Sequence, residues 1–318
     1  MFTFKPSFLR LLSLLAYSSG FKTASLETLL LLIELVTLFI MKNNLTVLFK
    51  NILSQKTEKQ ILGYKKNNKW LWKTRKDLKK NVLNCVNILR EKNIGFTDRV
   101  IYKGDNSYEW LSWNIAVNSL GGIWVPLYEN QTDKYVNYII EDSKPKLLIS
   151  NNEYENVDCI NNSYLYENYD DEIKGEIPVK DCKVAKLIYT SGTTGNPKGV
   201  ILSHENIISN YESIDKRFKD FKNRELTTLN ILPWAHIFGL TAELYCNIFN
   251  ENRIVISSGK ENFINEIREI QPDILYLVPR VLELIKSKLE YFDKPVIRVL
   301  LPMINKYIFG SNLITIFV

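Results

Sequence analysis

The sequence predicts an α/β fold with doubly wound, mostly parallel sheets and flanking helices, and three observations carry this prediction. Helix-like and strand-like patterns alternate over residues 74–150, which favours parallel pairing through helical crossovers. A further apolar strand, residues 184–189, runs into a loop rich in glycine and hydroxyl groups. With 46% hydrophobic and 24% charged residues, the 318-residue chain can bury a sizeable core, which excludes a disordered protein.

The net charge argues against nucleic-acid binding, and the cysteine spacing argues against a zinc site. A net charge of +6 over 318 residues is a weak field and not the basic footprint of a nucleic-acid-binding protein, so we expect no nucleic-acid partner. The cysteines form no CxxC pair and no short metal-ligand spacing, which argues against a zinc site and favours a reducing compartment, the cytoplasm. They are Cys85, Cys159, Cys182 and Cys246.

The first 40 residues differ in composition from the rest of the chain. Leucine-rich runs occupy residues 8–16 and 29–40, but Arg10 interrupts the first and Glu34 the second. The first is therefore a poor signal-peptide core, and the second is short for a membrane span. A membrane-surface anchor or hairpin, a secretory signal and an appendage remain open. We expect residues 1–40 to be an apolar leader outside the fold, with peripheral membrane contact as one alternative.

The elements between residues 41 and 150 follow in order. A capping box at Thr74–Asp77 predicts a helix with one apolar face, which Gly95 terminates. Trp110 and Trp113 have the spacing of core residues in the next helix. The predicted order is a helix with core face Leu78, Val82, Cys85, Val86 and Leu89, a strand at 99–103, a helix from Tyr108 to about 120, a strand at 123–127, a helix at 132–142 and a strand at 146–150.

The second half begins with a polar stretch. Residues 151–180 are rich in Asn, Tyr and acidic residues without periodicity, which predicts a long surface connection. His204 opens a helix, so a structural role is expected for it. Further strands are predicted at 184–189, 200–202, 253–257, 273–278 and 313–318, with the core face of a helix at 281–289.

The loop of residues 190–199, TSGTTGNPKG, carries the most specific chemistry. Glycines let backbone N–H groups approach phosphate oxygens, the hydroxyls donate hydrogen bonds, and Lys198 supplies a mobile positive charge. A hairpin loop without a ligand is the alternative. The loop is not of the Walker A type, because Gly192 and Gly195 are three residues apart and Lys198 precedes Gly199.

The longer string LIYTSGTTGNPKGVILSHENI resembles the phosphate-binding signature of the AMP-forming adenylating enzymes, which include acyl-CoA synthetases, aryl-CoA ligases and peptide-synthetase adenylation domains. Three further segments are similar to blocks of that superfamily in the same order: GDNSYEWLSWNIAVNSLGGIWVPLYEN (104–130), LNILPWAHIFGLTAEL (229–244) and PDILYLVPRVLELIKSKL (272–289). The resemblance covers about residues 41–318. The sequences LPWAHIFG and VPRVLE are most similar to those of the long-chain fatty-acyl-CoA synthetases.

The resemblance implies a partial AMP-binding (adenylating) domain at 41–318, the incomplete N-terminal domain of the acyl-CoA synthetase fold. The implied activity is that of a long-chain fatty acid–CoA ligase, with fatty acid, ATP and coenzyme A as ligands and Mg²⁺ as metal. The matching cofactor-binding positions are Thr190, Ser191, Gly192, Thr193, Thr194, Gly195 and Lys198. Thr190 also matches a position that helps to hold Mg²⁺.

The second motif implies the acyl side of the site. His236 matches a position whose imidazole lies near the reacting carboxylate and phosphate, and is the implied catalytic residue. Trp234 matches a wall or gate of the acyl pocket, with plain core packing as the alternative. Gly239 is expected to allow the following helix to approach the pocket closely.

The superfamily's downstream blocks do not occur in these 318 residues. They include a Tyr-Gly-x-Thr-Glu string, a ribose-binding Asp, a hinge and a mobile C-terminal domain. We therefore expect a truncated synthetase that is inactive by itself. Two other classes stay open: a non-catalytic lipid- or nucleotide-binding relic, and a membrane-surface scaffold that acts through residues 1–40.

Overall fold

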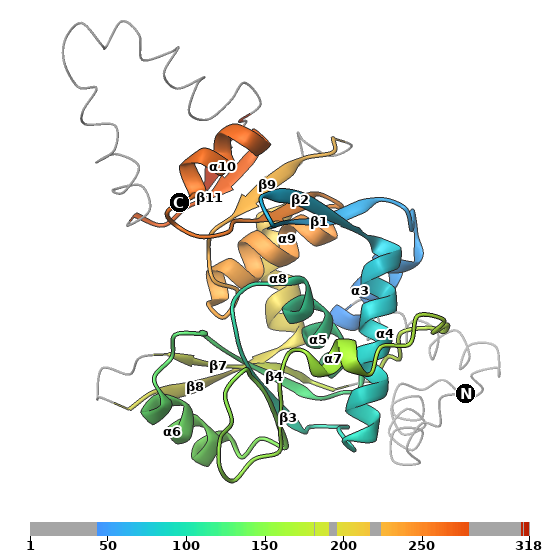
Figure 1. Cartoon of the computed structure of the whole chain (residues 1–318), viewed down its shortest axis with the longest axis vertical. Helices are drawn as coiled ribbons and strands as arrows, with labels where there is room; N and C mark the ends of the chain where they lie inside the picture. The colour runs from blue at the N-terminus through green and yellow to red at the C-terminus, as the bar shows by residue number, and fades with distance from the viewer. Residues whose placement is uncertain are drawn as a thin grey trace, which may run out of the picture. The chain divides into compact units, whose positions relative to one another are not determined.

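The computed structural model describes residues 43–180, 182–190, 196–216, 224–279, 313 and 315–317. Its contacts divide the chain into a unit of residues 1–43 and a unit of residues 44–318, and the second is described here. Within the described part, this unit contains two six-stranded sheets with helices packed on them (Figure 1). The predicted α/β class with mostly parallel sheets and flanking helices is confirmed.

One sheet carries the early motif and the glycine-rich loop. Its strands are β3 (Arg99–Lys103), β4 (Ile123–Leu127), β5 (Leu147–Ile149), β6 (Cys159–Ile160), β7 (Val184–Thr190) and β8 (Lys198–Ser203), in the order β6-β5-β3-β4-β7-β8. All neighbours pair in parallel except β7 and β8, which are antiparallel. Because a strand's side chains alternate, Val100 faces the core shared with α4 (Arg75–Glu91) and α5 (Tyr108–Ser119), whereas Ile101 packs on the side of α6 (Asp133–Ser143).

The other sheet carries the second motif. Its strands are β1 (Gln60–Lys66), β2 (Lys69–Thr74), β9 (Thr227–Asn230), β10 (Arg253–Ile256), β11 (Ile274–Tyr276) and β12 (Thr315–Phe317), in the order β12-β11-β9-β10-β1-β2. Only the β1–β2 pair is antiparallel. Helix α10 (Phe263–Ile270) buries Phe263 and Ile267 against Leu229, Val255 and Leu275 of this sheet.

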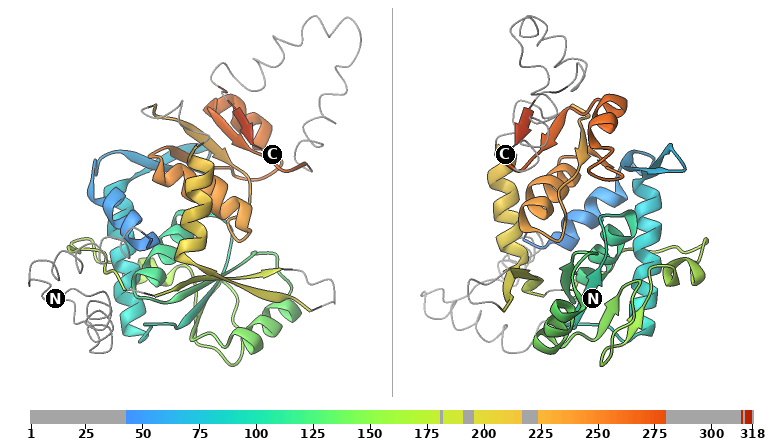
Figure 2. Two further views of the ribbon diagram at one scale, coloured as in Figure 1. Left: turned by 180° about the vertical axis from the view of Figure 1, so that it is seen from behind. Right: turned by 60° about the vertical axis from the view of Figure 1, so that its left-hand side comes forward.

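The remaining helices of the described part include four that the sequence predicts, at 75–91, 108–119, 133–143 and 204–215, and others that it does not, among them 45–54 and 164–167. They are α3 (Leu45–Ser54), α4 (Arg75–Glu91), α5 (Tyr108–Ser119), α6 (Asp133–Ser143), α7 (Tyr164–Glu167), α8 (His204–Asp215), the π-helix η2 (Gly239–Tyr245) and α9 (Cys246–Phe249). The capping box of α4 is present, with the Asp77 backbone N–H donating to Thr74 Oγ1 over 3.1 Å. Seen from behind, α8 runs from β8 towards the second sheet (Figure 2).

Two predicted features differ in detail. Helix α5 is buried all round and not on one face only, because it lies between α4 and the strands, so Asn114 and Asn118 are inside as well. The polar stretch at 151–180 contains the short strand β6, which extends the sheet next to β5, and the short helix α7, which buries Leu165. The predicted leader at 1–40 and the helix at 281–289 lie outside the described residues. No helix of the described part is long and apolar enough to cross a membrane.

His204, the first residue of α8, is a structural residue as expected. It is 3% exposed, and its Nδ1 accepts a hydrogen bond of 3.1 Å from the backbone N–H of Leu45. Burial, together with the nearby Lys186 ammonium, lowers the pKa of His204 from 6.5 to about 3. The imidazole is therefore neutral in the folded protein at every pH above that value.

This shift predicts a pH dependence of stability. The unfolded chain binds a proton at His204 near pH 6.5 and the folded chain does not, so the stabilisation is complete above pH 6.5 and is lost as the pH falls towards 3. The slope from this one group is at most about 1.4 kcal/mol per pH unit. Urea unfolding at several pH values should show it, and His204→Asn, which keeps an acceptor for Leu45 but cannot titrate, should have a flatter profile. Identical slopes for both proteins would contradict the assignment.

Candidate functional site

The glycine-rich string forms the connection of a β-hairpin. Strands β7 and β8 pair in antiparallel register, and Thr190 at the end of β7 stands opposite Lys198 at the start of β8. Ser191, Gly192, Thr193, Thr194 and Gly195 lie outside the described residues. The two described ends of the loop therefore bring the Thr190 hydroxyl and the Lys198 ammonium to the same end of one hairpin.

Both of these side chains are available to a ligand. Thr190 and Lys198 are exposed, and within the described part of the chain neither forms a side-chain hydrogen bond or an ion pair. The next residues of β8 are also uncovered, with Val200 43% and Ile201 65% exposed. A free ammonium beside a hydroxyl suits phosphate oxygens, and a hydroxyl is an oxygen ligand of the kind that Mg²⁺ accepts. The residues present thus fit a phosphate group and its metal.

The hairpin connection lies at the carboxyl ends of the parallel strands, where α/β proteins bind ligands. Because β7 runs parallel to β4, Thr190 is at the same edge as the residues that follow β3 and β4. A cavity of about 720 Å³ opens at the carboxyl ends of β3, β4, β9 and β10, and so joins the two sheets. It is lined by residues that include Asn106, Tyr128, Asn230, Pro233, Ala235 and Ser257.

The second motif forms one wall of this cavity. It follows β9 as an irregular segment, residues 231–236, and residues 237–238 are already helical before η2 begins. Trp234 is completely buried, with its ring centroid 5.5 Å from that of Trp110 in an edge-to-face arrangement. His236, two residues later, is exposed, and its Nδ1 accepts a hydrogen bond of 3.3 Å from the backbone N–H of Phe238. The motif therefore packs its indole inward and presents its imidazole to solvent.

Gly239 is required at the start of η2 by a close approach. A Cβ at this position would overlap the carbonyl oxygen of Pro233 and lie 3.0 Å from its carbonyl carbon. The same carbonyl accepts a hydrogen bond of 3.1 Å from the backbone N–H of His236. The absence of a side chain at Gly239 therefore lets the motif fold back against the helix that follows it.

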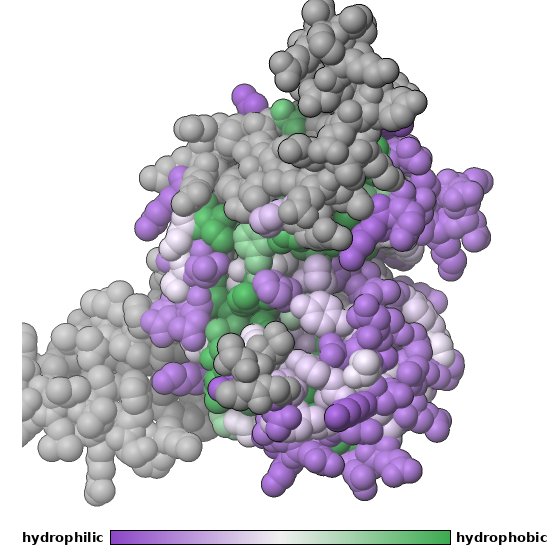
Figure 3. All heavy atoms as spheres, turned by 90° about the vertical axis from the view of Figure 1, so that its left-hand side faces the viewer, coloured by the Kyte–Doolittle hydropathy of each residue, from purple (hydrophilic) through white to green (hydrophobic). Residues whose placement is uncertain are grey.

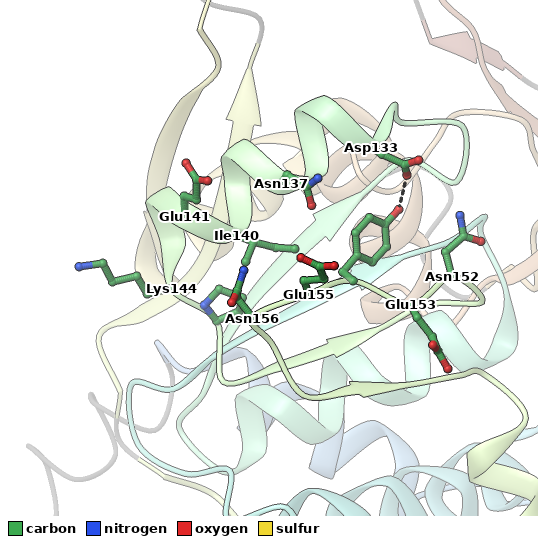
Figure 4. Close-up of a pocket in the computed structure, with 11 residues that line it drawn as sticks. Asp133, Asn137, Ile140, Glu141, Lys144, Asn152, Glu153, Glu155 and Asn156 are labelled. Atoms are coloured by element: carbon green, nitrogen blue, oxygen red, sulfur yellow. Dashed lines mark hydrogen bonds between the residues drawn. The ribbon is translucent and has the colours of Figure 1, made fainter.

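Another pocket, of about 840 Å³, lies beside α6 (Figure 4). Its labelled side chains come from α6 and from residues 152–156, and Tyr154 donates a hydrogen bond of 2.9 Å to Asp133 Oδ1. Four carboxylates and only one ammonium, that of Lys144, line it. Such a lining repels phosphate. None of the predicted site residues that the structure describes lines this pocket or the cavity of about 720 Å³, but the second motif contributes Pro233 and Ala235 to the latter.

One face of the molecule combines hydrophobic and hydrophilic surface (Figure 3). Figure 3 shows one face of the molecule on which hydrophobic side chains gather in a band, with hydrophilic surface beside it. Within the described residues, no group of three or more His, Cys, Asp and Glu side chains could hold a metal ion. The contact of Thr190 with Mg²⁺ stays a prediction.

Sequence reasoning missed the polar residues that hold the second motif in place. Asn106 directly precedes Ser107, the cap of α5, whose Oγ accepts from the backbone N–H of Trp110 over 3.0 Å. Asn106 contacts the second motif from outside, and Asn230 and Glu243 contact each other within it. The one visible signal in the sequence is Glu243, an acidic residue in the middle of an otherwise apolar helical run.

Comparisons with known proteins agree with this arrangement. Long chain acyl-CoA synthetases 3 and 4 of Arabidopsis thaliana are 31% and 28% identical to the chain over 264 and 266 residues. Each alignment covers 71% of this chain and 39% of the relative, so the chain spans about two fifths of the length of these relatives.

Solved structures share the fold. The inhibitor-bound N-terminal domain of FACL13 from Mycobacterium tuberculosis superposes with a TM-score of 0.67 at 21% identity, covering 80% of this chain and 66% of that domain. The fatty acid AMP ligase from Legionella pneumophila gives 0.62 at 20% identity, covering 74% and 44%. The model of the AMP-binding enzyme family matches residues 49–310. The chain therefore belongs to the AMP-binding enzyme family of adenylate-forming ligases.

Proposed function

We propose that the protein activates a long-chain fatty acid for transfer to coenzyme A. In the first step the fatty-acid carboxylate attacks the α-phosphorus of ATP, the bond to the bridging oxygen breaks, and pyrophosphate leaves. In the second step the CoA thiolate attacks the acyl carbonyl and AMP leaves. The observation that carries the proposal is the hairpin that places Thr190 opposite Lys198 around the TSGTTGNPKG string.

The chain's own residues would act mainly by positioning and by electrostatics. Lys198 and the hydroxyls of the loop would hold the phosphate oxygens whose charge grows as pyrophosphate departs. Mg²⁺, held with the help of Thr190, would supply further neutralisation of that charge. His236 would donate a hydrogen bond near the reacting carboxylate, while Trp234 and Gly239 would shape the acyl pocket behind it.

The long-chain specificity, the cytoplasmic location and the use of CoA belong to this proposal. The similarity to long chain acyl-CoA synthetases of Arabidopsis thaliana and the sequence of the second motif support the specificity and the use of CoA. The cysteine pattern supports the location. The 318 residues carry the phosphate and acyl motifs on which this proposal rests.

Calorimetric titration with Mg-pyrophosphate tests the phosphate assignment. We expect Lys198→Ala to weaken binding by about 2 kcal/mol, roughly 30-fold in Kd, because a charge-assisted contact is lost. Lys69→Ala is a matched control, since Lys69 is also exposed, is also the first residue of the second strand of a hairpin, and has no ion pair within the described residues. Equal affinities for the Lys198 and Lys69 variants would contradict the assignment.

A further inference from the structure

Asn106 connects the two sheets at the cavity. It lies in the turn after β3, and its Nδ2 donates to Asn230 Oδ1 over 2.8 Å and to the carbonyl oxygen of Leu232 over 2.7 Å. Its Oδ1 accepts from the backbone N–H of Trp234 over 2.8 Å. One side chain thus uses both of its amide hydrogens and its oxygen on a segment more than 120 residues further along the chain.

The same segment is held from its other side by a buried acid. Asn230 Nδ2 donates to Leu232 O over 2.9 Å and to Oε2 of Glu243, which lies on η2 and is completely buried. Burial raises the pKa of Glu243 well above its usual range, despite hydrogen bonds from Asn230 and from the backbone of the segment. A neutral carboxyl group accepting from Asn230 avoids the cost of a buried charge.

Together these contacts determine where the second motif lies. Residues 231–236 have no regular secondary structure, so side chains must satisfy their backbone groups. Asn106 holds Leu232 and Trp234, and Glu243 acts through Asn230. We propose that Asn106, with Asn230 and Glu243, is a positioning residue that fixes the imidazole of His236 beside the cavity between the two sheets.

The alternative is that Asn106 serves only the stability of its own turn. This is disfavoured because Ser107 already caps α5, and because the three hydrogen-bond partners of the Asn106 side chain among the described residues all lie on the second motif. A purely local role would leave His236 unaffected when Asn106 is changed.

The test uses the fact that the chain has only two histidines. The imidazole ¹H–¹³Cε1 NMR resonance of His236 should shift in Asn106→Ala, while that of His204 stays in place. Asn84→Ala is the matched control, since Asn84 also donates twice through Nδ2 and accepts once through Oδ1, but contacts Lys80 and Asp170 instead. The control should leave the His236 resonance unchanged.

Asn106→Asp guards against a variant that fails to fold. It keeps the volume and the acceptor for Trp234 but replaces the donor to Asn230 and Leu232 by an oxygen, so the His236 resonance should shift in it too. If His236 is unmoved in both Asn106 variants, the positioning role is wrong.

A second measurement deepens the proposed function and rests on it. Palmitate should bind Asn106→Ala at least tenfold more weakly than wild type, whereas Mg-pyrophosphate should bind both equally. If wild type binds no palmitate, the proposed function fails, and the His236 resonance alone still decides the positioning role. If palmitate binds both proteins equally and His236 is unmoved, the positioning role fails and the proposed function stands.

Discussion

Gly239→Ala is expected to lower the free energy of unfolding by about 3 kcal/mol, the upper range for overpacking in a close-packed site. The added Cβ would overlap the carbonyl oxygen of Pro233, and this oxygen is backbone and hydrogen-bonded to the His236 N–H, so it cannot rotate away. The clash outweighs the gain of up to about 1 kcal/mol that alanine normally gives over glycine in a helix. Urea unfolding monitored by tryptophan fluorescence measures the difference.

Gly95→Ala is the control for this substitution. An ideal Cβ at Gly95 meets no atom within 4 Å, so alanine should be neutral or stabilising there. If Gly239→Ala were as stable as Gly95→Ala, the segment of residues 231–236 would not be packed against η2 as the structure has it.

Trp234→Ala is expected to cost about 3–5 kcal/mol, the range for removing a buried aromatic side chain. Trp234 is fully buried and packs edge-to-face on Trp110, which in turn packs on Trp124 with its centroid 5.3 Å away. Trp234→Phe should cost much less, because a phenyl ring retains the contact with Trp110. Chemical unfolding of both variants provides the comparison.

The partly exposed Trp70 provides the matched control. It contacts Lys65 and donates from Nε1 to Glu269, but it lies on β2 away from the tryptophan cluster. Trp70→Ala should therefore cost clearly less than Trp234→Ala. A small cost at Trp234 would mean that its indole is not a core element.

Local signals made much of the fold predictable. The capping box at Thr74 and the apolar face of α4 are encoded within a few residues, and both are confirmed. The β1–β2 hairpin was missed although its turn is also local: Asn67 and Asn68 have φ of 50° and 57°, which two-residue hairpin turns require. An Asn-Asn pair between KK and KW was a usable signal for that turn.

The candidate site was less predictable, for a physical reason. The loop at 190–199 is recognisable because its chemistry is carried by consecutive residues, and its hairpin ends are where the pattern places them. The contacts of Asn106 join residues 124 to 128 positions apart, so no periodicity reports them. Lys186, buried on β7 and hydrogen-bonded to Asn114 and Asn118, depends in the same way on how α5 packs on the sheet.

Calorimetric titration of the wild-type 318-residue chain with palmitate tests the central claim, that it holds a long-chain carboxylate beside a phosphate-binding hairpin. The account predicts saturable binding of one palmitate per chain, and no binding of the methyl ester, which lacks the carboxylate. Absence of palmitate binding, or equal binding of the acid and the ester, would contradict it.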